Sequence, residues 1–277
     1  MNKKTVLITG GNAGIGFATA RVLAKEGAQV LLACRNQDKA IAAAKFIRQE
    51  KPDAFVEVLS LDLSSLAEIK KSADRIKTLY PSIDVLINNA GVYCPTQQFT
   101  VDGYELQFGV NYLGHFLLTH LLLSSLKHSG QARIINVASI GHWMGGIRPK
   151  NFKGWKKYNS FMAYGQSKLA NILFSHVMSR RLAQDGIISN AIHPGGIDSD
   201  LYRQLPNWLY AVFRLFLIGT ERPARMIADM ALSERWQSKT GEYVSAHMPD
   251  WQSKEAKDAL AADCLYAQSV ALVQDYL

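Results

Sequence analysis

Short, nearly continuous apolar runs alternate with longer amphipathic stretches along this chain. The runs are rich in valine, isoleucine and leucine, and they lack the polar–apolar alternation of a half-exposed strand, as expected for strands buried on both faces of a parallel sheet. Six such runs lie at residues 5–9, 28–34, 55–61, 83–89, 132–139 and 188–194. The sequence therefore predicts a buried parallel sheet.

Stretches with helical periodicity separate the predicted strands, and each is long enough to be the crossover helix that two parallel strands require. The clearest lie at 16–28, 37–50, 66–80 and 114–130. This order predicts an α/β fold: a single Rossmann-type, doubly wound parallel sheet with helices on both faces. The chain shows no internal repeat, linker or low-complexity segment, so we expect one domain over residues 1–277.

The β–α rhythm is interrupted twice, near 142–160 and near 196–222. Insertions that follow the strands of an open parallel sheet fall at its carboxyl edge, which is where ligands bind. We therefore expect both insertions to face the substrate.

Composition narrows the class of protein. The chain has 277 residues, of which 48% are hydrophobic and 19% charged, enough for one domain with a sizeable core. We recognise no signal peptide and no apolar run of about 18 residues, so we expect a cytoplasmic location. The three cysteines and the histidines lack the spacing of a disulfide framework or a metal site, and we predict no metal.

The net charge of +8 is compatible with nucleic acid, an anionic membrane surface or an anionic cofactor. The densest basic stretch, at 147–158, interleaves aromatic residues with lysines but carries no recognised nucleic-acid motif. We therefore predict a solvated loop there and no nucleic-acid partner.

A glycine-rich turn, TGGNAGIG, follows the first predicted strand and opens the first predicted helix. It has Gly10, Gly14 and Gly16 at a G-x-x-x-G-x-G spacing, with Asn12 and Ile15 inside it. Glycines at such a turn allow the backbone to approach a pyrophosphate, whose charge is favoured by the N–H groups and dipole at the helix start. The context predicts a dinucleotide site, with a purely structural turn as the alternative.

The residues after the second and third strands bear on the type of dinucleotide. NAD-binding chains often place an acidic residue after the second strand to bind the ribose hydroxyls. Here Cys34 is followed by Arg35, whose guanidinium suits a 2′-phosphate unless it is simply a solvated surface group. We predict NADP as the cofactor and NAD as the less favoured alternative. Asp62 and Leu63 could meet the adenine, although an aspartate before serines is also a common helix cap.

Five motifs occur in a characteristic order: TGGNAGIG, NNAG at 88–91, Ser139, YGQSK at 164–168 and HPGG at 193–196. Together they resemble the short-chain dehydrogenase/reductase family over nearly the whole chain. The resemblance implies one Rossmann domain that holds a nicotinamide cofactor and carries the catalytic residues. It places those at Asn111, Ser139, Tyr164 and Lys168.

The residue types agree with these roles. An unperturbed tyrosine has a pKa of about 10 and is a weak base at neutral pH, but a neighbouring cation favours its phenolate. Lys168 lies one helical turn from Tyr164 and can act as that cation. Tyr164 would exchange a proton with the substrate oxygen while Ser139 hydrogen-bonds the same atom. Taken singly, each residue also has an ordinary structural explanation as a core, turn or cap residue.

The resemblance implies further contacts to the cofactor. It assigns Lys168 to the nicotinamide ribose, beside Tyr164, and Asn111 to a bent helix and a water chain that feeds the proton relay. The remaining contacts it implies are Asn89, Ala90, Gly91, Pro194, Gly195 and Ile197, with Ser199 at a position where the family often has threonine. It also implies that a homo-oligomer is possible.

Several stretches, including LLACRN and YGQSKLANILF, look like the retinol dehydrogenase-related branch. That branch implies an NADP-dependent enzyme that interconverts an alcohol and a carbonyl on a small hydrophobic substrate such as a retinoid, lipid aldehyde or sterol. It also implies that the aromatic, apolar segment 205–219 is a substrate flap, with a peripheral membrane contact as an alternative. A non-catalytic dinucleotide sensor and a membrane-surface lipid-binding protein remain as competing hypotheses.

Overall fold

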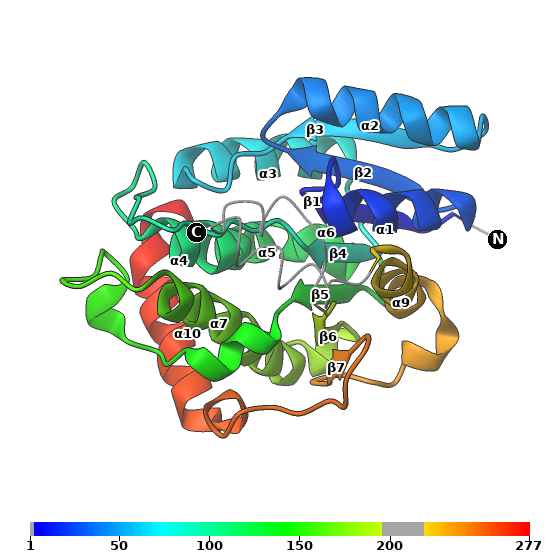
Figure 1. The fold of residues 1–277 in the computed structure, drawn as a ribbon. Helices are drawn as coiled ribbons and strands as arrows, with labels where there is room; N and C mark the ends of the chain where they lie inside the picture. Colours follow the sequence, from blue (N-terminus) through cyan, green and yellow to red (C-terminus); the bar gives the residue numbers. More distant parts are fainter. Residues whose placement is uncertain (1–2, 196–218) are drawn as a thin grey trace.

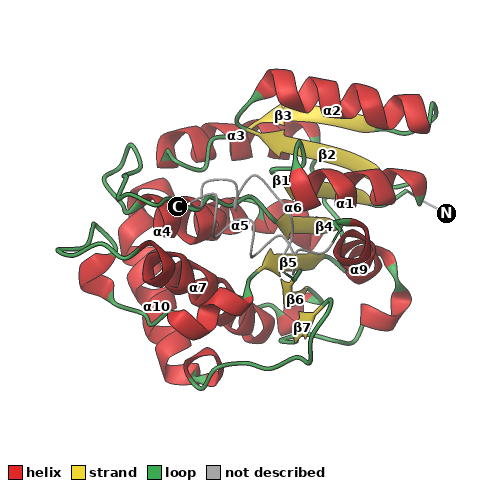
Figure 2. Ribbon diagram, in the orientation of Figure 1, coloured by secondary structure: helices red, strands yellow, loops and turns green. Residues whose placement is uncertain are grey.

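A parallel sheet forms the centre of the molecule. The computed structural model describes residues 3–195 and 219–277. Within this part of the chain, seven strands pair in the order β3-β2-β1-β4-β5-β6-β7, and every pair is parallel (Figures 1 and 2). The strands are β1 (Thr5–Thr9), β2 (Gln29–Cys34), β3 (Val56–Ser60), β4 (Val85–Asn88), β5 (Arg133–Val137), β6 (Ile188–His193) and β7 (Tyr243–Ser245).

Helices cover both faces of this sheet (Figure 2). Residues of α3, α5, α7 and α10 share one apolar cluster with strand residues such as Leu7, whereas α1, α2 and α9 share a second cluster with residues such as Val6 and Ile8. Because neighbouring residues of a strand point to opposite faces, the continuous apolar runs supply both clusters. The helices are α1 (Gly14–Lys25), α2 (Gln37–Glu50), α3 (Leu66–Leu79), α4 (Leu106–Phe108), α5 (Gly114–Leu121), α6 (Leu123–His128), α7 (Ser160–Arg181), α9 (Glu221–Leu232) and α10 (Ala259–Val273).

The strand order reverses between β1 and β4. The chain proceeds outward from β1 to β2 and β3, and then returns to place β4 on the other side of β1. At such a switch point the loops that follow the two strands diverge and leave a crevice at the carboxyl edge of the sheet. The fold therefore offers a ligand site beside the ends of β1 and β4.

The predicted fold class is confirmed, and the structure adds two features. All six predicted strands are present, and the three-residue strand β7 extends the sheet beyond β6. The predicted helix at 114–130 is divided into α5 and α6, and it follows directly on a π-helical turn at Gly109–Leu113.

Of the two interruptions of the β–α rhythm, the structure describes the first in full and only the end of the second. Residues 142–160 contain the end of one short 3-10 helix, Ile140–Met144, and a second one, Pro149–Asn151. Most of the 196–222 stretch, including nearly all of the predicted flap at 205–219, lies outside the described residues. Within the described ranges, no helix combines the length and apolar character needed to cross a membrane.

Candidate active site

A cavity of about 470 Å³ opens at the carboxyl edge of the sheet, around the switch point. The loops that follow β1, β2, β3, β4, β5 and β6 line it together with α7. Residues predicted from the sequence that line this cavity are Gly10, Asn12, Gly14, Ile15, Gly16, Arg35, Asp62, Leu63, Asn89, Ala90, Gly91, Ser139, Tyr164, Lys168, Pro194 and Gly195.

The glycine turn is packed too closely to accept side chains. Gly10 has a φ of 66°, and a Cβ at Gly16 would lie 2.4 Å from the Gly10 carbonyl oxygen. The bare backbone therefore forms one wall of the cavity where α1 begins, as a pyrophosphate site at a helix N-terminus requires. The residues present fit a bound dinucleotide.

Thr9, at the end of β1, joins the glycine turn to the NNAG motif after β4. Its Oγ1 accepts hydrogen bonds from the backbone N–H groups of Asn89 and Ala90, both at 2.9 Å. In return, the Asn89 side-chain amide donates to the Thr9 carbonyl at 2.7 Å. These bonds fix the two sides of the switch point relative to each other, so the cavity walls are pre-formed.

The end of β2 provides a cationic corner of the cavity. Arg35 and Lys39 both line it, together with Asn36, whose side chain caps α2 by accepting from the Lys39 N–H. Cys34 is 2% exposed, and burial raises the pKa of its thiol to about 11, so it is a neutral group in this corner. After the neighbouring strand β3, Asp62 lines the cavity and its Oδ1 accepts from both the N–H and the hydroxyl of Ser64. Asp62 thus shapes a turn, while Ser65 is the cap of α3.

Lys168 is an almost fully buried cation on α7. Only 4% of it is exposed, and loss of solvation lowers its pKa to about 8. Its Nζ donates to the Val137 carbonyl at 3.0 Å and lies 5.6 Å from the centre of the Tyr164 ring. A Cβ placed on Gly91 would be 3.5 Å from the same Nζ. The ammonium group therefore lies between the phenol and the NNAG loop.

Ser139 and Tyr164 meet across Gly141. A Cβ on Gly141 would lie 3.1 Å from two ring carbons of Tyr164 and 3.5 Å from Ser139 Oγ. Ser139 Oγ accepts from the Gly141 N–H at 3.1 Å, which leaves its own proton available to another acceptor. Tyr93 packs edge-on against Tyr164, with ring centres 5.9 Å apart. The structure therefore brings the predicted serine, tyrosine and lysine to one side of the cavity.

Asn111 lies behind the cavity wall, fully buried in the π-helical turn. Its side-chain amide exchanges two hydrogen bonds with the backbone of Val92, which lines the cavity, and donates to Ser167 Oγ. The backbone carbonyl oxygen of Asn111 lies 3.0 Å from Nδ1 of the buried His115. The Nε2 of His115 lies 2.8 Å from Thr9 Oγ1. The bend that the family resemblance implies for this segment is a π-helical turn. Hydrogen bonds between Asn111 and Val92 connect this turn to the loop that contains NNAG.

Two predicted contacts, Ile197 and Ser199, lie outside the described residues. Conversely, sequence reasoning missed several residues that line the cavity: Ala13, Ala33, Asn36, Lys39, Leu61, Val92, Tyr93, Val110, Val137 and Ala138. For Lys39 a signal existed, because it lies in the first turn of the helix predicted at 37–50 and only four residues after Arg35. Within the described ranges, no group of three or more histidine, cysteine, aspartate or glutamate side chains is placed to hold a metal ion.

Comparison with known proteins decides the family. Residues 4–209 match the short chain dehydrogenase family. The chain belongs to this family. It is 42% identical to mouse retinol dehydrogenase 12 and 41% identical to human retinol dehydrogenase 11, in each case over 98% of this chain and 86% of the relative. The short-chain dehydrogenase described here therefore lies in the retinol dehydrogenase-like branch.

Solved structures agree with this assignment. An uncharacterised protein from Mycobacterium paratuberculosis is 36% identical and superposes with a TM-score of 0.78, covering 98% of this chain and 93% of the other. A 3-ketoacyl-(acyl-carrier-protein) reductase from Brucella melitensis complexed with NADH has the same fold, with a TM-score of 0.70 over 87% of this chain and 96% of the other, at 24% identity. These structures confirm the fold, and the family match together with the retinol dehydrogenase relatives supports an oxidoreductase that acts on CH–OH groups with a nicotinamide dinucleotide.

Proposed function

We propose that this protein is an NADP-dependent oxidoreductase that interconverts an alcohol and a carbonyl on a small hydrophobic substrate. The observation that carries the proposal is the convergence of Ser139, Tyr164 and Lys168 on one side of the carboxyl-edge cavity. The backbone at Gly10, Gly14 and Gly16 would hold a nicotinamide dinucleotide, which would supply or accept the hydride when bound.

Three side chains exchange the proton, orient the substrate oxygen and stabilise the phenolate. During reduction the carbonyl carbon gains a hydride, and the carbonyl oxygen gains the phenolic proton of Tyr164, so the product is an alcohol. Ser139 donates its hydroxyl proton in a hydrogen bond to the same oxygen and orients it. Lys168 stabilises the phenolate that remains. Oxidation follows the same path in reverse, with Tyr164 as the base.

The cationic corner supports a preference for NADP. Arg35 and Lys39 line the cavity at the end of β2, where a carboxylate would favour NAD. Asp62 is the only acidic residue among the described cavity-lining residues, and its Oδ1 is occupied by Ser64. Two cations suit a 2′-phosphate, and no carboxylate lines the cavity in the described segment that directly follows β2.

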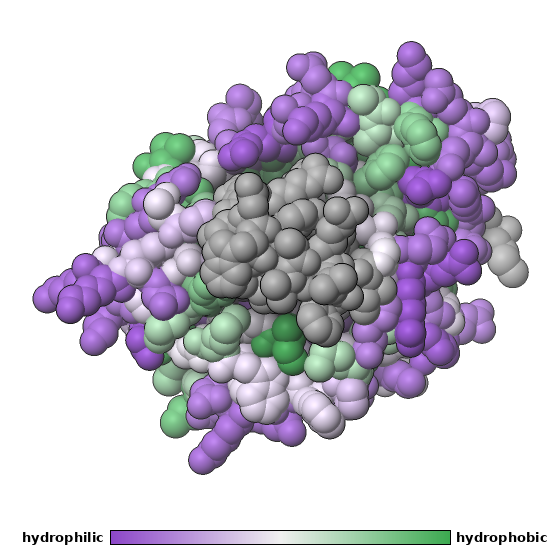
Figure 3. All heavy atoms as spheres, viewed as in Figure 1, coloured by the Kyte–Doolittle hydropathy of each residue, from purple (hydrophilic) through white to green (hydrophobic). Residues whose placement is uncertain are grey.

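Apolar side chains support a hydrophobic substrate. Ile140, Trp143 and Met144, which follow the catalytic serine, are 38%, 52% and 48% exposed. Phe161 at the start of α7 is 38% exposed and packs against the cavity-lining Tyr93. Figure 3 shows hydrophobic side chains at several places on this face, some of them at its rim, among mostly hydrophilic ones. The relatives named above are retinol dehydrogenases, whose substrate is apolar.

The Tyr164→Phe variant tests this function. The phenylalanine keeps the ring packing against Tyr93 and Gly141 but cannot exchange a proton, so we expect NADPH binding to be retained and kcat to fall roughly 100-fold or more. Turnover is followed as loss of NADPH absorbance with aliphatic, aromatic, retinoid and steroid carbonyls. NADPH affinity is measured separately by calorimetry.

The matched control is Tyr266→Phe, which removes the same hydroxyl from α10, outside the cavity. It should leave kcat unchanged. Undiminished turnover in Tyr164→Phe would refute the assigned role of the tyrosine. A wild-type protein that binds NADPH tightly but reduces no compound of the panel would instead favour a dinucleotide sensor.

A further inference from the structure

The peptide unit that joins Ser139 to Ile140 lies between two imidazole rings. On one side, His142 Nδ1 is 2.7 Å from the Ser139 carbonyl oxygen. On the other side, His193 Nδ1 accepts the Ile140 N–H at 3.2 Å. Both polar groups of this one peptide are therefore held by histidine side chains, one from the short 3-10 helix and one from the end of β6.

The partners of His142 fix where its proton lies. A carbonyl oxygen can only accept, so Nδ1 must carry the hydrogen. Its Nε2 lies 3.1 Å from the backbone N–H of Ser253, which can only donate, so Nε2 must be unprotonated. His142 is consequently neutral, and it ties the Ser139 peptide to the segment that follows β7.

The partners of His193 require the opposite tautomer. Its Nδ1 faces two donors, the N–H of Ile140 and, at 3.4 Å, the N–H of Gly195. Nδ1 must therefore be unprotonated, and the hydrogen of the neutral ring lies on Nε2. His193 thus joins the loop after Ser139 to the loop that carries Pro194 and Gly195.

Burial supports the neutral form of both rings. His142 is fully buried and His193 is 2% exposed. Desolvation is the main cause that lowers the pKa of His193 to about 4, and the nearby cation of Lys168 acts in the same direction. Desolvation also lowers the pKa of His142, although the bond to Ser139 and the charge of Glu255 oppose this shift.

We propose that His142 and His193 are a pair of positioning residues that clamp the Ser139–Ile140 peptide and thereby hold the Ser139 hydroxyl toward Tyr164. The two rings act only with complementary tautomers, because one must donate to the carbonyl while the other accepts from the N–H. Neither ring lines the cavity, so both act through Ser139. The catalytic part of this proposal rests on the proposed function.

Nitrogen NMR of the full-length protein labelled with ¹⁵N-histidine tests the clamp without any assay of activity. At pH 7 we expect His142 to be protonated on Nδ1 alone and His193 on Nε2 alone. Single-histidine variants assign the signals. The same tautomer at both positions, or a doubly protonated ring at either, would overturn the proposal.

Variants at His193 test the consequence for Ser139. His193→Leu removes the acceptor, so amide exchange at Ile140 should accelerate at least tenfold, and kcat should fall roughly ten- to a hundredfold because the hydroxyl is displaced. His193→Asn can present its amide oxygen near the position of Nδ1 and should restore most of the kcat. NADPH affinity should change much less than kcat in both variants.

The control is His120→Leu, which removes a partly buried imidazole away from the cavity. The Nδ1 of His120 lies 2.7 Å from the backbone carbonyl oxygen of Phe116. This variant should leave kcat and Ile140 exchange unchanged. If kcat fell and Ile140 exchange accelerated equally in His120→Leu and His193→Leu, the changes would reflect general destabilisation of the protein, and the clamp would be rejected. If the wild-type protein lacked turnover, the proposed function would fail, whereas the tautomers and Ile140 exchange would still decide the clamp.

Discussion

At the scale of one residue, the buried ammonium group of Lys168 lowers the stability of the folded protein. This group is removed from water and compensated by one backbone carbonyl, that of Val137. That carbonyl does not depend on the lysine, because Asn171 Nδ2 also donates to it at 3.1 Å. The charge therefore adds little to the fold, which agrees with the role proposed for Lys168 beside the phenol and the cofactor.

We predict that Lys168→Met abolishes turnover and raises the free energy of unfolding of the cofactor-free protein by roughly 1–3 kcal/mol at pH 7. Methionine fills a similar volume, and Val137 keeps its other donor. Denaturant unfolding measures the change. The control, Lys45→Met, replaces an exposed lysine of α2 and should change stability by about 0.5 kcal/mol or less.

The lowered pKa of Lys168 also determines how the stability difference between the wild type and Lys168→Met changes with pH. Between the folded pKa of about 8 and the ordinary lysine value of about 10.4, the unfolded chain binds the proton that the folded protein lacks. Wild-type stability relative to Lys168→Met should therefore rise across this window, and the advantage of the variant should shrink. An advantage that grew between pH 8 and pH 10 would contradict the assignment of a buried, destabilised ammonium.

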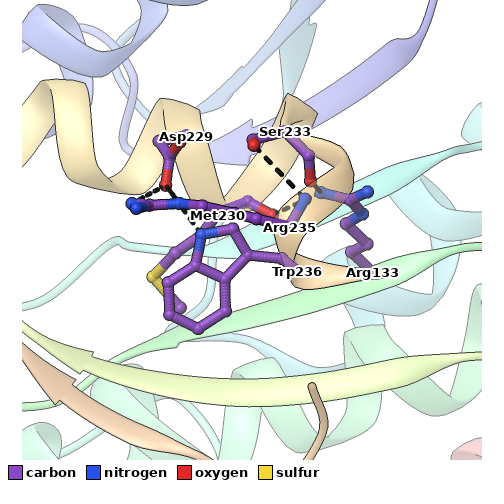
Figure 4. Close-up of polar contacts among 6 residues, drawn as sticks. All are labelled: Arg133, Asp229, Met230, Ser233, Arg235 and Trp236. Atoms are coloured by element: carbon purple, nitrogen blue, oxygen red, sulfur yellow. Dashed lines mark hydrogen bonds and ion pairs between the residues drawn. The ribbon is translucent and has the colours of Figure 1, made fainter. Parts of the chain in front are cut away.

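At the scale of one element, α9 is anchored at its C-terminus by a buried arginine of the sheet. Arg133, on β5, is 4% exposed, and its Nη1 donates to the carbonyls of Met230 and Ser233, both at 2.8 Å (Figure 4). Next to it, Asp229 accepts from Arg235 and from the Trp236 indole nitrogen. Arg133 thereby satisfies carbonyls that the end of a helix leaves without partners.

Replacing Arg133 by methionine should destabilise the protein by about 1–3 kcal/mol, because the Met230 and Ser233 carbonyls lose a charged donor in a buried place. The change is measured as the midpoint shift in urea unfolding. Arg235→Met is the comparison, since this arginine is 61% exposed and its ion pair with Asp229 should contribute about 1 kcal/mol or less. Equal losses in the two variants would contradict the capping role of Arg133.

The elements also show what a sequence pattern can and cannot predict. Long apolar runs located six strands correctly, whereas β7 spans only Tyr243–Ser245 and has too few residues for a periodic signal. The π-turn at Gly109–Leu113 depends on shifted backbone hydrogen bonds, which apolar spacing does not encode. Motifs placed Ser139, Tyr164 and Lys168. Of the two histidines that hold the Ser139 peptide, His142 follows Ser139 by three residues, whereas His193 reaches the Ile140 N–H from 53 residues further along the chain and is brought there only by folding.

At the scale of the whole molecule, the cavity joins the two halves of the sheet. Arg35 and Lys39 belong to the half that contains β2, and Tyr164 and Lys168 lie on α7, between β5 and β6. A dinucleotide bound along the cavity would contact both halves at once. Any ligand that binds only the folded state raises stability by an amount set by its affinity. The cofactor that binds more tightly should therefore raise the melting temperature more.

We predict that NADPH raises the melting temperature more than NADH at the same free concentration. A tenfold difference in affinity corresponds to about 1.4 kcal/mol, or roughly 2–3 °C for a chain of this size. Arg35→Asp should abolish or reverse the difference, because it replaces by an anion the cation that we propose faces the 2′-phosphate. Differential scanning calorimetry measures all four combinations of protein and cofactor.

The charge change itself needs a control, since reversing any lysine or arginine alters the field around an anionic ligand. Lys45→Asp makes the same change on an exposed position of α2 outside the cavity and should keep the NADPH preference. If Arg35→Asp left the ratio of the two affinities unchanged while Lys39→Asp reversed it, the 2′-phosphate would belong to Lys39. If neither altered the ratio, the cationic corner would not discriminate the two cofactors, because a direct ion pair cannot be removed without loss of affinity for the phosphorylated dinucleotide.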